Sequence, residues 1–115
     1  MNRNPAIYIM TNRPFGTLYV GVTSNLIKRV WEHRESKVNG FSCEYGLHRL
    51  VWFEMHATMI DAIAREKQVK RWNRAWKIRL ILERNRDWRD LWPDIVGAHV
   101  TSKDSNGSPA SRDDD

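Results

Sequence analysis

The pattern of apolar and polar residues begins with two short apolar runs, Ala6–Met10 and Thr17–Val22, both rich in Ile, Tyr and Val. Residues 11–16 separate the two runs and contain Asn, Pro and Gly. β-Branched and aromatic residues favour strands, whereas Asn, Pro and Gly favour turns. The segment therefore predicts a β-hairpin.

The register of this hairpin decides how its two tyrosines are arranged. If the turn is centred between Arg13 and Pro14, Tyr8 lies directly opposite Tyr19. Directly opposed residues share a sheet face, so the two phenols would lie side by side. A slip of one residue would place them on opposite faces.

An amphipathic helix is expected directly after the hairpin. Residues 23–25, Thr-Ser-Asn, form a capping cluster in front of it. Arg29 and His33 are four residues apart, so we expect them to stack on one flank of the helix, near Tyr19. The apolar stripe beside them consists of Leu26, Ile27, Val30, Trp31 and the stem of Arg34.

The rest of the chain predicts one more strand and two more helices. Residues 36–46 show little apolar periodicity and are expected to form a loop. Leu50–Met55 is nearly continuously apolar, which favours a central strand packed on both faces. Thr58, with Asp61 three residues later, marks a helix start, and a last helix is expected from residue 73 or 74 to 84. The predicted fold is α+β, a small three-stranded antiparallel sheet flanked by helices in the order β-β-α-β-α-α.

Glu66 falls on the apolar face of the second helix. A carboxylate on a buried face is costly unless a cation accompanies it. Two partners remain open, a basic side chain from the first helix or a metal ion, and residue chemistry alone favours the salt bridge. The apolar residues that share this face are Met59, Ala62, Ile63 and Val69.

Two pairs of tryptophans follow at helical spacing. Trp72 and Trp76 are four residues apart, and tryptophans in such a pattern are more often core residues than platforms for nucleobases. Trp88 and Trp92 are also four apart and are expected to close onto the same core.

Composition limits the class of protein. The 115 residues, of which 41% are hydrophobic, are enough for one globular domain. Cys43 is the only cysteine, which excludes an intrachain disulfide and a cysteine-cluster zinc site and fits a reducing compartment. No apolar run approaches the ~20 residues of a membrane span, and the N-terminus lacks the pattern of a signal peptide. We therefore expect a cytoplasmic protein with no membrane partner.

The net charge of +5 is concentrated in one segment. Residues 65–89 carry ten basic and three acidic side chains, whereas residues 1–64 carry seven and five. Such a segment is either a solvated helix face or a surface that binds a polyanion. From residue 97 onward Ser, Gly, Pro, Asn and Asp dominate, so we expect a domain over 1–96 and a disordered acidic tail over 97–115. The candidate nucleic-acid-binding residues are Lys67, Lys70, Arg71, Arg74 and Lys77.

One combination of residues resembles a known family. The tripeptides Ala6-Ile7-Tyr8 and Tyr19-Val20-Gly21 are followed by Arg29 and His33, and then by Glu66 within a basic helix. This combination resembles the GIY-YIG nucleases over residues 6 to about 92. The chain looks most similar to their small single-domain members, which are related to the nuclease module of the bacterial excinuclease incision subunit.

The resemblance implies a function and a role for each residue. It implies an endonuclease that hydrolyses DNA with one Mg²⁺ or Mn²⁺ ion held by Glu66, in DNA repair or recombination. Tyr19 would be the general base, and Tyr8 would orient Tyr19 or the water. Arg29 would bind the scissile phosphate, and His33 would accept the proton or contact a phosphate.

The chain departs from the family pattern at several positions. Ala6 replaces the first glycine, and Val22 stands where the excinuclease module has a lysine. Asn73 stands where a basic residue is expected. Asn85 matches a late asparagine of the family, but Arg86 rather than proline follows it.

Two alternatives to an active nuclease remain. The first is a module that keeps the fold and binds DNA or RNA through the basic segment without cutting it. The second is a subunit recruited to a repair complex, whose specificity lies in a protein partner. The intact set of five residues favours the active enzyme.

Overall fold

A computed structural model describes residues 4–35 and 46–97. The expected loop over 36–46 and the tail from residue 97 lie outside the described residues, except for Gly46 and Gly97. The predicted α+β class and element order are confirmed. The elements are β1 (Ala6–Thr11), β2 (Leu18–Thr23), α1 (Leu26–Arg34), β3 (Arg49–Met55), α3 (Met59–Arg71) and α4 (Arg74–Arg84).

The sheet is antiparallel with the strand order β2-β1-β3, so β1 is the central strand. The expectation that the third strand is central is wrong. β3 is nevertheless packed on both faces, and backbone groups at its outer edge are bonded to the segment after α4. Leu91 N donates to Leu50 O at 2.8 Å, and Asn85 Nδ2 donates to Val51 O at 3.1 Å. Covering an edge in this way keeps the strand from pairing with another chain.

The hairpin register differs by two residues from the expected one. Tyr8 pairs with Gly21 and Met10 pairs with Tyr19, so the two tyrosines are diagonal neighbours. The turn is centred one residue later than expected, and Phe15 within it adopts a left-handed φ of 57°. Because side chains alternate with a period of two, this shift leaves both phenols on the same face of the sheet.

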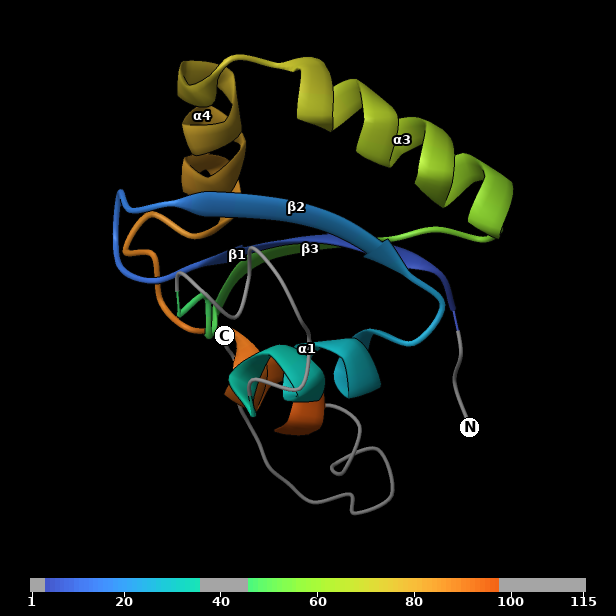
Figure 1. The fold of residues 1–115 in the computed structure, drawn as a ribbon, viewed down its shortest axis with the longest axis horizontal. Helices are drawn as coiled ribbons and strands as arrows, with labels where there is room; N and C mark the ends of the chain where they lie inside the picture. The colour runs from blue at the N-terminus through green and yellow to red at the C-terminus, as the bar shows by residue number, and fades with distance from the viewer. Residues whose placement is uncertain (1–3, 36–45, 98–115) are drawn as a thin grey trace.

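Two helical layers enclose the sheet (Figure 1). α3 and α4 cover one face, whereas α1 and the helical residues 92–97 cover the other. Alternate residues of β1 supply both cores, as the strand period requires. Ile7 and Ile9 join the α3–α4 core, and Ala6, Tyr8 and Met10 join the α1 core.

The three helix starts confirm the sequence signals. Asn25, Thr58 and Asn73 are the N-cap residues of α1, α3 and α4. Each side chain accepts a hydrogen bond from a backbone N–H in the first turn of its helix. Such caps typically contribute about 1 kcal/mol each.

Two tryptophans expected in the core are exposed instead. Trp31 is 45% exposed and Trp76 is 54% exposed. The sheet-facing side of α4 is formed by Ile78, Ile81 and Leu82, which places Trp76 on the outside. The closing tryptophans also separate between the layers: Trp88 is buried in the α3–α4 core, and Trp92 packs against the α1 core.

Candidate active site

Tyr8 and His33 form a buried polar pair between β1 and α1. Tyr8 is fully buried and His33 is 1% exposed. Tyr8 Oη lies 3.1 Å from His33 Nε2. The expectation that His33 sits on a flank of the helix is wrong, because Leu26, Val30 and His33 together form the buried face of α1.

The surroundings of this pair keep both groups uncharged at neutral pH. Burial raises the pKa of the Tyr8 phenol above its usual value, and the neighbouring Tyr19 raises it further. Arg29 offsets only part of this rise. Burial is the main cause that lowers the pKa of His33, and the positive charge of Arg29 is the second; together they bring it to about 4. An uncharged imidazole leaves one ring nitrogen as an acceptor, so the phenol O–H can donate to Nε2.

Gly21 makes room for the Tyr8 phenol. It pairs with Tyr8 across the hairpin, and a Cβ atom on Gly21 would overlap Tyr8 Oη and Cζ. A side chain at this position would displace the ring from His33. This role was not predicted from the sequence, because the expected register placed Tyr19, and not Gly21, opposite Tyr8.

Tyr19 and Arg29 lie on the same face and are nearer the surface than the buried pair. The Tyr19 ring lies 6.3 Å from the Tyr8 ring and 5.3 Å from the His33 ring. The Arg29 side chain is 40% exposed, and its Nε donates to Glu32 Oε1 at 3.1 Å. Glu32 was not among the predicted site residues, although its position three residues after Arg29 on a helix is a signal for such a pair.

A small polar hollow opens beside Arg29 at the start of α1. Its volume is about 150 Å³. Lys28 and Arg29 give it cationic side chains, and Glu32 adds one carboxylate. The hollow is lined by Thr23, Ser24, Asn25, Lys28, Arg29 and Glu32.

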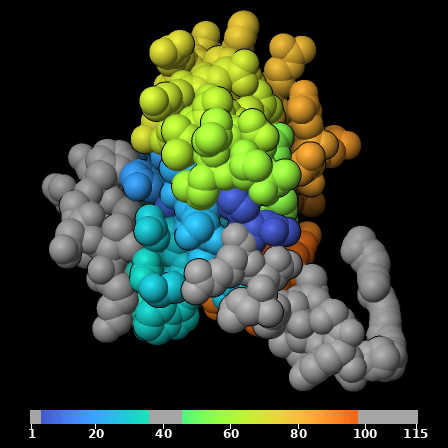
Figure 2. Space-filling model, turned by 90° about the vertical axis from the view of Figure 1, so that its right-hand side faces the viewer, coloured from blue at the N-terminus to red at the C-terminus, as the bar shows by residue number. Residues whose placement is uncertain are grey.

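Glu66 lies on α3, in the layer on the other face of the sheet. It is buried to 7% exposure, and its Oε2 lies 2.5 Å from Lys70 Nζ. The partner is therefore a cation, as residue chemistry favoured, but it comes from α3 itself. The first helix cannot supply it across the sheet. β2 is the edge strand between α1 and α3, and Figure 2 shows α3 above the strands and α1 below them.

Glu66 could supply one carboxylate to a metal ion, in competition with Lys70. Within residues 4–35 and 46–97 there is no group of three or more His, Cys, Asp or Glu side chains that could hold an ion. A single carboxylate with hard oxygen atoms suits Mg²⁺ or Mn²⁺, and magnesium usually keeps several of its waters. The side chain of the competing Lys70 is 54% exposed, so it can swing into solvent.

The five candidate nucleic-acid-binding residues do not form one uniform surface. Lys67 and Arg71 are exposed on α3, and Lys77 is half-buried on α4. Lys70 is paired with Glu66. Arg74 donates to the carbonyl oxygens of Phe15 and Gly16 at 2.7 and 2.8 Å, so it also anchors the hairpin turn.

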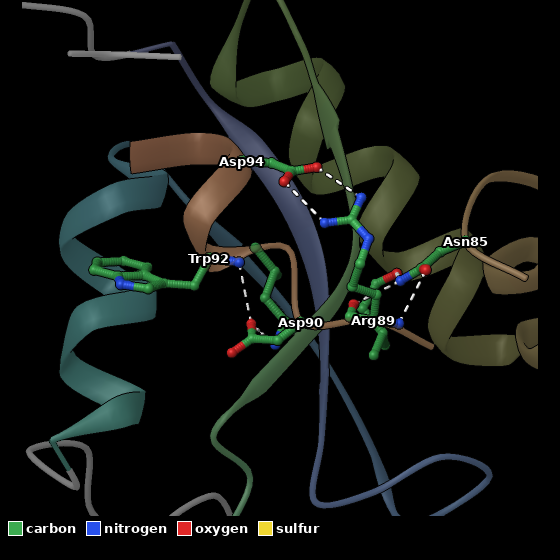
Figure 3. A network of polar contacts seen from close by, with 7 residues as sticks. Asn85, Arg89, Asp90, Trp92 and Asp94 are labelled. Atoms are coloured by element: carbon green, nitrogen blue, oxygen red, sulfur yellow. Dashed lines mark hydrogen bonds and ion pairs between the residues drawn. The ribbon is translucent and has the colours of Figure 1, made fainter. Parts of the chain in front are cut away.

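Asn85 holds the chain where it leaves α4 (Figure 3). Its Nδ2 donates to Val51 O and to Arg89 O, and its Oδ1 accepts from Arg89 N. Arg89 in turn binds both carboxylate oxygens of Asp94, and Asp90 Oδ1 accepts from Trp92 N. All three bonds of the Asn85 amide go to backbone atoms, so the geometry favours a structural role for this residue.

The fold and the site together define a class. The small α+β domain gathers two phenols, a neutral imidazole and a guanidinium on one face of its sheet, and the buried carboxylate of Glu66 lies in the layer on the other face. The model of the GIY-YIG catalytic domain matches residues 4–79. The chain belongs to this family of nuclease-type domains.

Curated relatives lie in the same family. A UPF0213 protein of Syntrophus aciditrophicus is 36% identical over 69 residues, which cover 56% of this chain and 76% of the relative. A UPF0213 protein of Staphylococcus aureus strain Mu3 is 33% identical over 69 residues, covering 60% of this chain and 84% of the relative. No solved structure matches the chain significantly. No helix among the described residues is both long and apolar enough to cross a bilayer.

Proposed function

We propose that the protein is a metal-dependent endonuclease that hydrolyses DNA phosphodiester bonds, with its catalytic face formed by β1, β2 and α1. The observation that carries the proposal is the buried, uncharged Tyr8–His33 pair beneath Tyr19. Replacing both members of a hydrogen-bonded buried pair by apolar groups of similar shape can be neutral or stabilising, so packing alone does not require this pair.

We assign Tyr19 as the general base that takes a proton from the attacking water. It is less buried than Tyr8 and lies on the same face as Arg29. A free phenol with a pKa of ~10 is a weak base at neutral pH, so it needs a route for its own proton. His33 is a poor acceptor for that proton, because its pKa is lowered to about 4 and its Nε2 is already hydrogen-bonded to Tyr8 Oη. The half-buried Tyr19 would therefore pass the proton to solvent.

His33 lies against the two phenol rings and is shielded from solvent. Because the imidazole is only 1% exposed, it has no surface to offer to a phosphate. A buried imidazole with a lowered pKa fits neither of the two roles that the resemblance implies, so we assign His33 to positioning the phenols. Its 3.1 Å contact from Nε2 to Oη holds the fully buried Tyr8.

Arg29 supplies the positive charge for the scissile phosphate. Its planar guanidinium can bind two phosphate oxygens, and this interaction strengthens as negative charge builds in the transition state. Glu32 holds Nε in place, and the guanidinium also hydrogen-bonds with the Tyr8 phenol. The Arg29 side chain is 40% exposed, so part of it is open to a ligand. Lys28 adds a second cation at the rim of the same hollow.

Glu66 is the residue that we assign to the metal ion, Mg²⁺ or Mn²⁺. When bound, such an ion would neutralise charge on the phosphate and stabilise the leaving oxygen. In this proposal the phosphate lies at the edge strand β2, with Glu66 on the α3 side of the sheet and Arg29 on the α1 side. Without a metal ion, Lys70 neutralises the carboxylate of Glu66, with 2.5 Å between Nζ and Oε2.

Exposed cations on α3 support DNA as the substrate. Lys67 and Arg71 carry positive charge on the surface of the helix that also bears Glu66. Each phosphate neutralised by such a residue releases counterions, which drives binding. We therefore favour polyanion binding over a merely solvated face for this part of the segment.

The test is the nicking of labelled duplex, flap, branched and single-stranded DNA in Mg²⁺ or Mn²⁺. Wild type is compared with Glu66→Gln, which keeps the shape of the buried side chain, and with Glu35→Gln as a control at an exposed carboxylate. We expect cleavage by wild type and Glu35→Gln, and none by Glu66→Gln, with similar DNA affinities for all three. Cleavage by Glu66→Gln at the wild-type rate would exclude the metal assignment, and binding without cleavage by wild type would favour the non-catalytic module.

A further inference from the structure

A second cleft lies between α3 and α4, and the proposed cleavage chemistry does not use it. Its volume is about 320 Å³. It combines two indole rings with two guanidinium groups, one aliphatic side chain and one carboxylate. The residues that line it are Arg65, Trp72, Trp76, Arg79, Leu80 and Glu83.

The indole rings of this cleft differ in their support. Trp72 is half-buried and packs against the α3–α4 core. Trp76 is 54% exposed, and its ring meets that of Trp72 at 74° with 5.7 Å between centroids. Trp76 therefore offers a flat, solvent-facing ring whose position is fixed by its neighbour.

One charged group beside the rings, Arg65, is also held in place. The Arg65 guanidinium lies 5.3 Å from the Trp72 ring centroid. It donates to Glu54 at 3.1 Å and to Gln68 at 2.6 Å. Arg79 is exposed at the wall of the cleft. The cleft thus presents two packed aromatic rings, one fixed guanidinium and one exposed guanidinium, and it lies in the segment 65–89 with ten basic and three acidic residues.

We propose that this cleft binds an unpaired nucleobase of DNA. Every base has a π-face that can stack on an exposed tryptophan, and single-strand sites commonly combine such rings with basic side chains. Arg79 is placed to contact the adjoining phosphate. The Glu83 carboxylate repels phosphate from the cleft and can accept hydrogen bonds from the amino groups of a base.

The placement of the cleft suggests a class of substrate, and this step rests on the proposed nuclease function. The cleft belongs to the α3–α4 layer, whereas Tyr8 and Tyr19 face α1, which carries His33. One DNA molecule that fills both sites must pass from one face of the sheet to the other. A flexible single strand beside a duplex meets this requirement, so a flap or a branch is preferred over an uninterrupted duplex.

The test measures the binding of fluorescently labelled single-stranded, duplex and flap DNA, with chelator present to prevent cleavage. Wild type is compared with Trp76→Ala, Trp76→Phe and Trp31→Ala, the last an exposed tryptophan on α1 as a matched control. Stacking of one base predicts a roughly tenfold weaker affinity of Trp76→Ala for single-stranded and flap DNA, with duplex affinity unchanged. Trp76→Phe should restore most of the affinity, and Trp31→Ala should bind like wild type. A single-stranded RNA of the same sequence shows whether the sugar matters.

Two results would overturn the proposal. One is equal affinity of wild type and Trp76→Ala for single-stranded and flap DNA. The other is an equal loss for duplex and single strand, which would indicate a general effect on the fold. Cleavage is measured separately. If the wild type does not cleave DNA but Trp76→Ala loses single-strand binding, the proposed nuclease function is wrong and the proposed base-binding cleft is supported.

Discussion

Protonation of His33 should destabilise the folded protein at mildly acidic pH. Burial and the nearby charge of Arg29 lower its pKa to about 4, whereas an imidazole in the unfolded chain titrates near 6.5. Between these values the unfolded chain holds one proton more than the folded one. Stability is therefore fully present above pH 6.5 and is lost as the pH falls towards 4.

The size of this loss follows from the shift. Each unit of pKa difference corresponds to about 1.4 kcal/mol, so the full effect is on the order of 3 kcal/mol. That is a large part of the 5–15 kcal/mol by which domains are typically stable. Glu32 works against the shift and His48 adds slightly to it, so neither cancels the effect of burial.

The assay is equilibrium unfolding by urea at a series of pH values from 7 to 4, followed by tryptophan fluorescence. His33→Gln removes the titrating group and keeps a hydrogen-bonding atom for Tyr8. Carboxylates titrate in the same range, so the difference between wild type and variant is the informative quantity. We expect the wild type to lose about 3 kcal/mol more than His33→Gln, and His48→Gln to behave like wild type. Parallel pH profiles for wild type and His33→Gln would refute the buried, neutral imidazole.

Three further substitutions test other parts of the account. Gly21→Ala should cost about 1–3 kcal/mol in urea unfolding, because the new Cβ overlaps the Tyr8 phenol, and it should abolish cleavage; a fully stable, active variant would contradict this. Asn85→Ala should lower the melting temperature by several degrees, because it removes three hydrogen bonds to the backbone, and an unchanged melting temperature would argue against its structural role. Replacing Lys67 and Arg71 with Ala should reduce the dependence of log K on log salt by about one for each phosphate that the variant no longer neutralises, and an unchanged slope would move the DNA path away from α3.

Local signals predicted the framework of the domain well. The capping residues Asn25, Thr58 and Asn73 each begin a helix in the structure. Such signals act within one helical turn, so the neighbouring sequence contains all the information that they need. The strands that carry Tyr8 and Tyr19 were also predicted from local sequence, because a turn-forming segment separates two runs of strand-forming residues.

Features that depend on tertiary packing were harder to predict. The hairpin register was shifted by two residues, because the left-handed Phe15 moves the centre of the turn. The burial of His33 and the exposure of Trp76 depend on which side of a helix meets the sheet, and similar apolar stripes allow either choice. The partner of Glu66 came from its own helix, because α1 packs on the opposite face. The spacing of residues along the sequence does not determine the hairpin register, the buried side of each helix or the partner of Glu66.

The central claim is that the face formed by Tyr8, Tyr19, Arg29 and His33 carries out phosphodiester hydrolysis. Its most direct test is the single-turnover cleavage rate of labelled flap DNA by Tyr19→Phe, which removes one oxygen atom from the proposed base. General-base catalysis typically contributes 10²–10⁴-fold, so we predict a rate at least about 100-fold below wild type, with unchanged DNA affinity and urea midpoint. A Tyr19→Phe variant that cleaves at the wild-type rate would contradict the account.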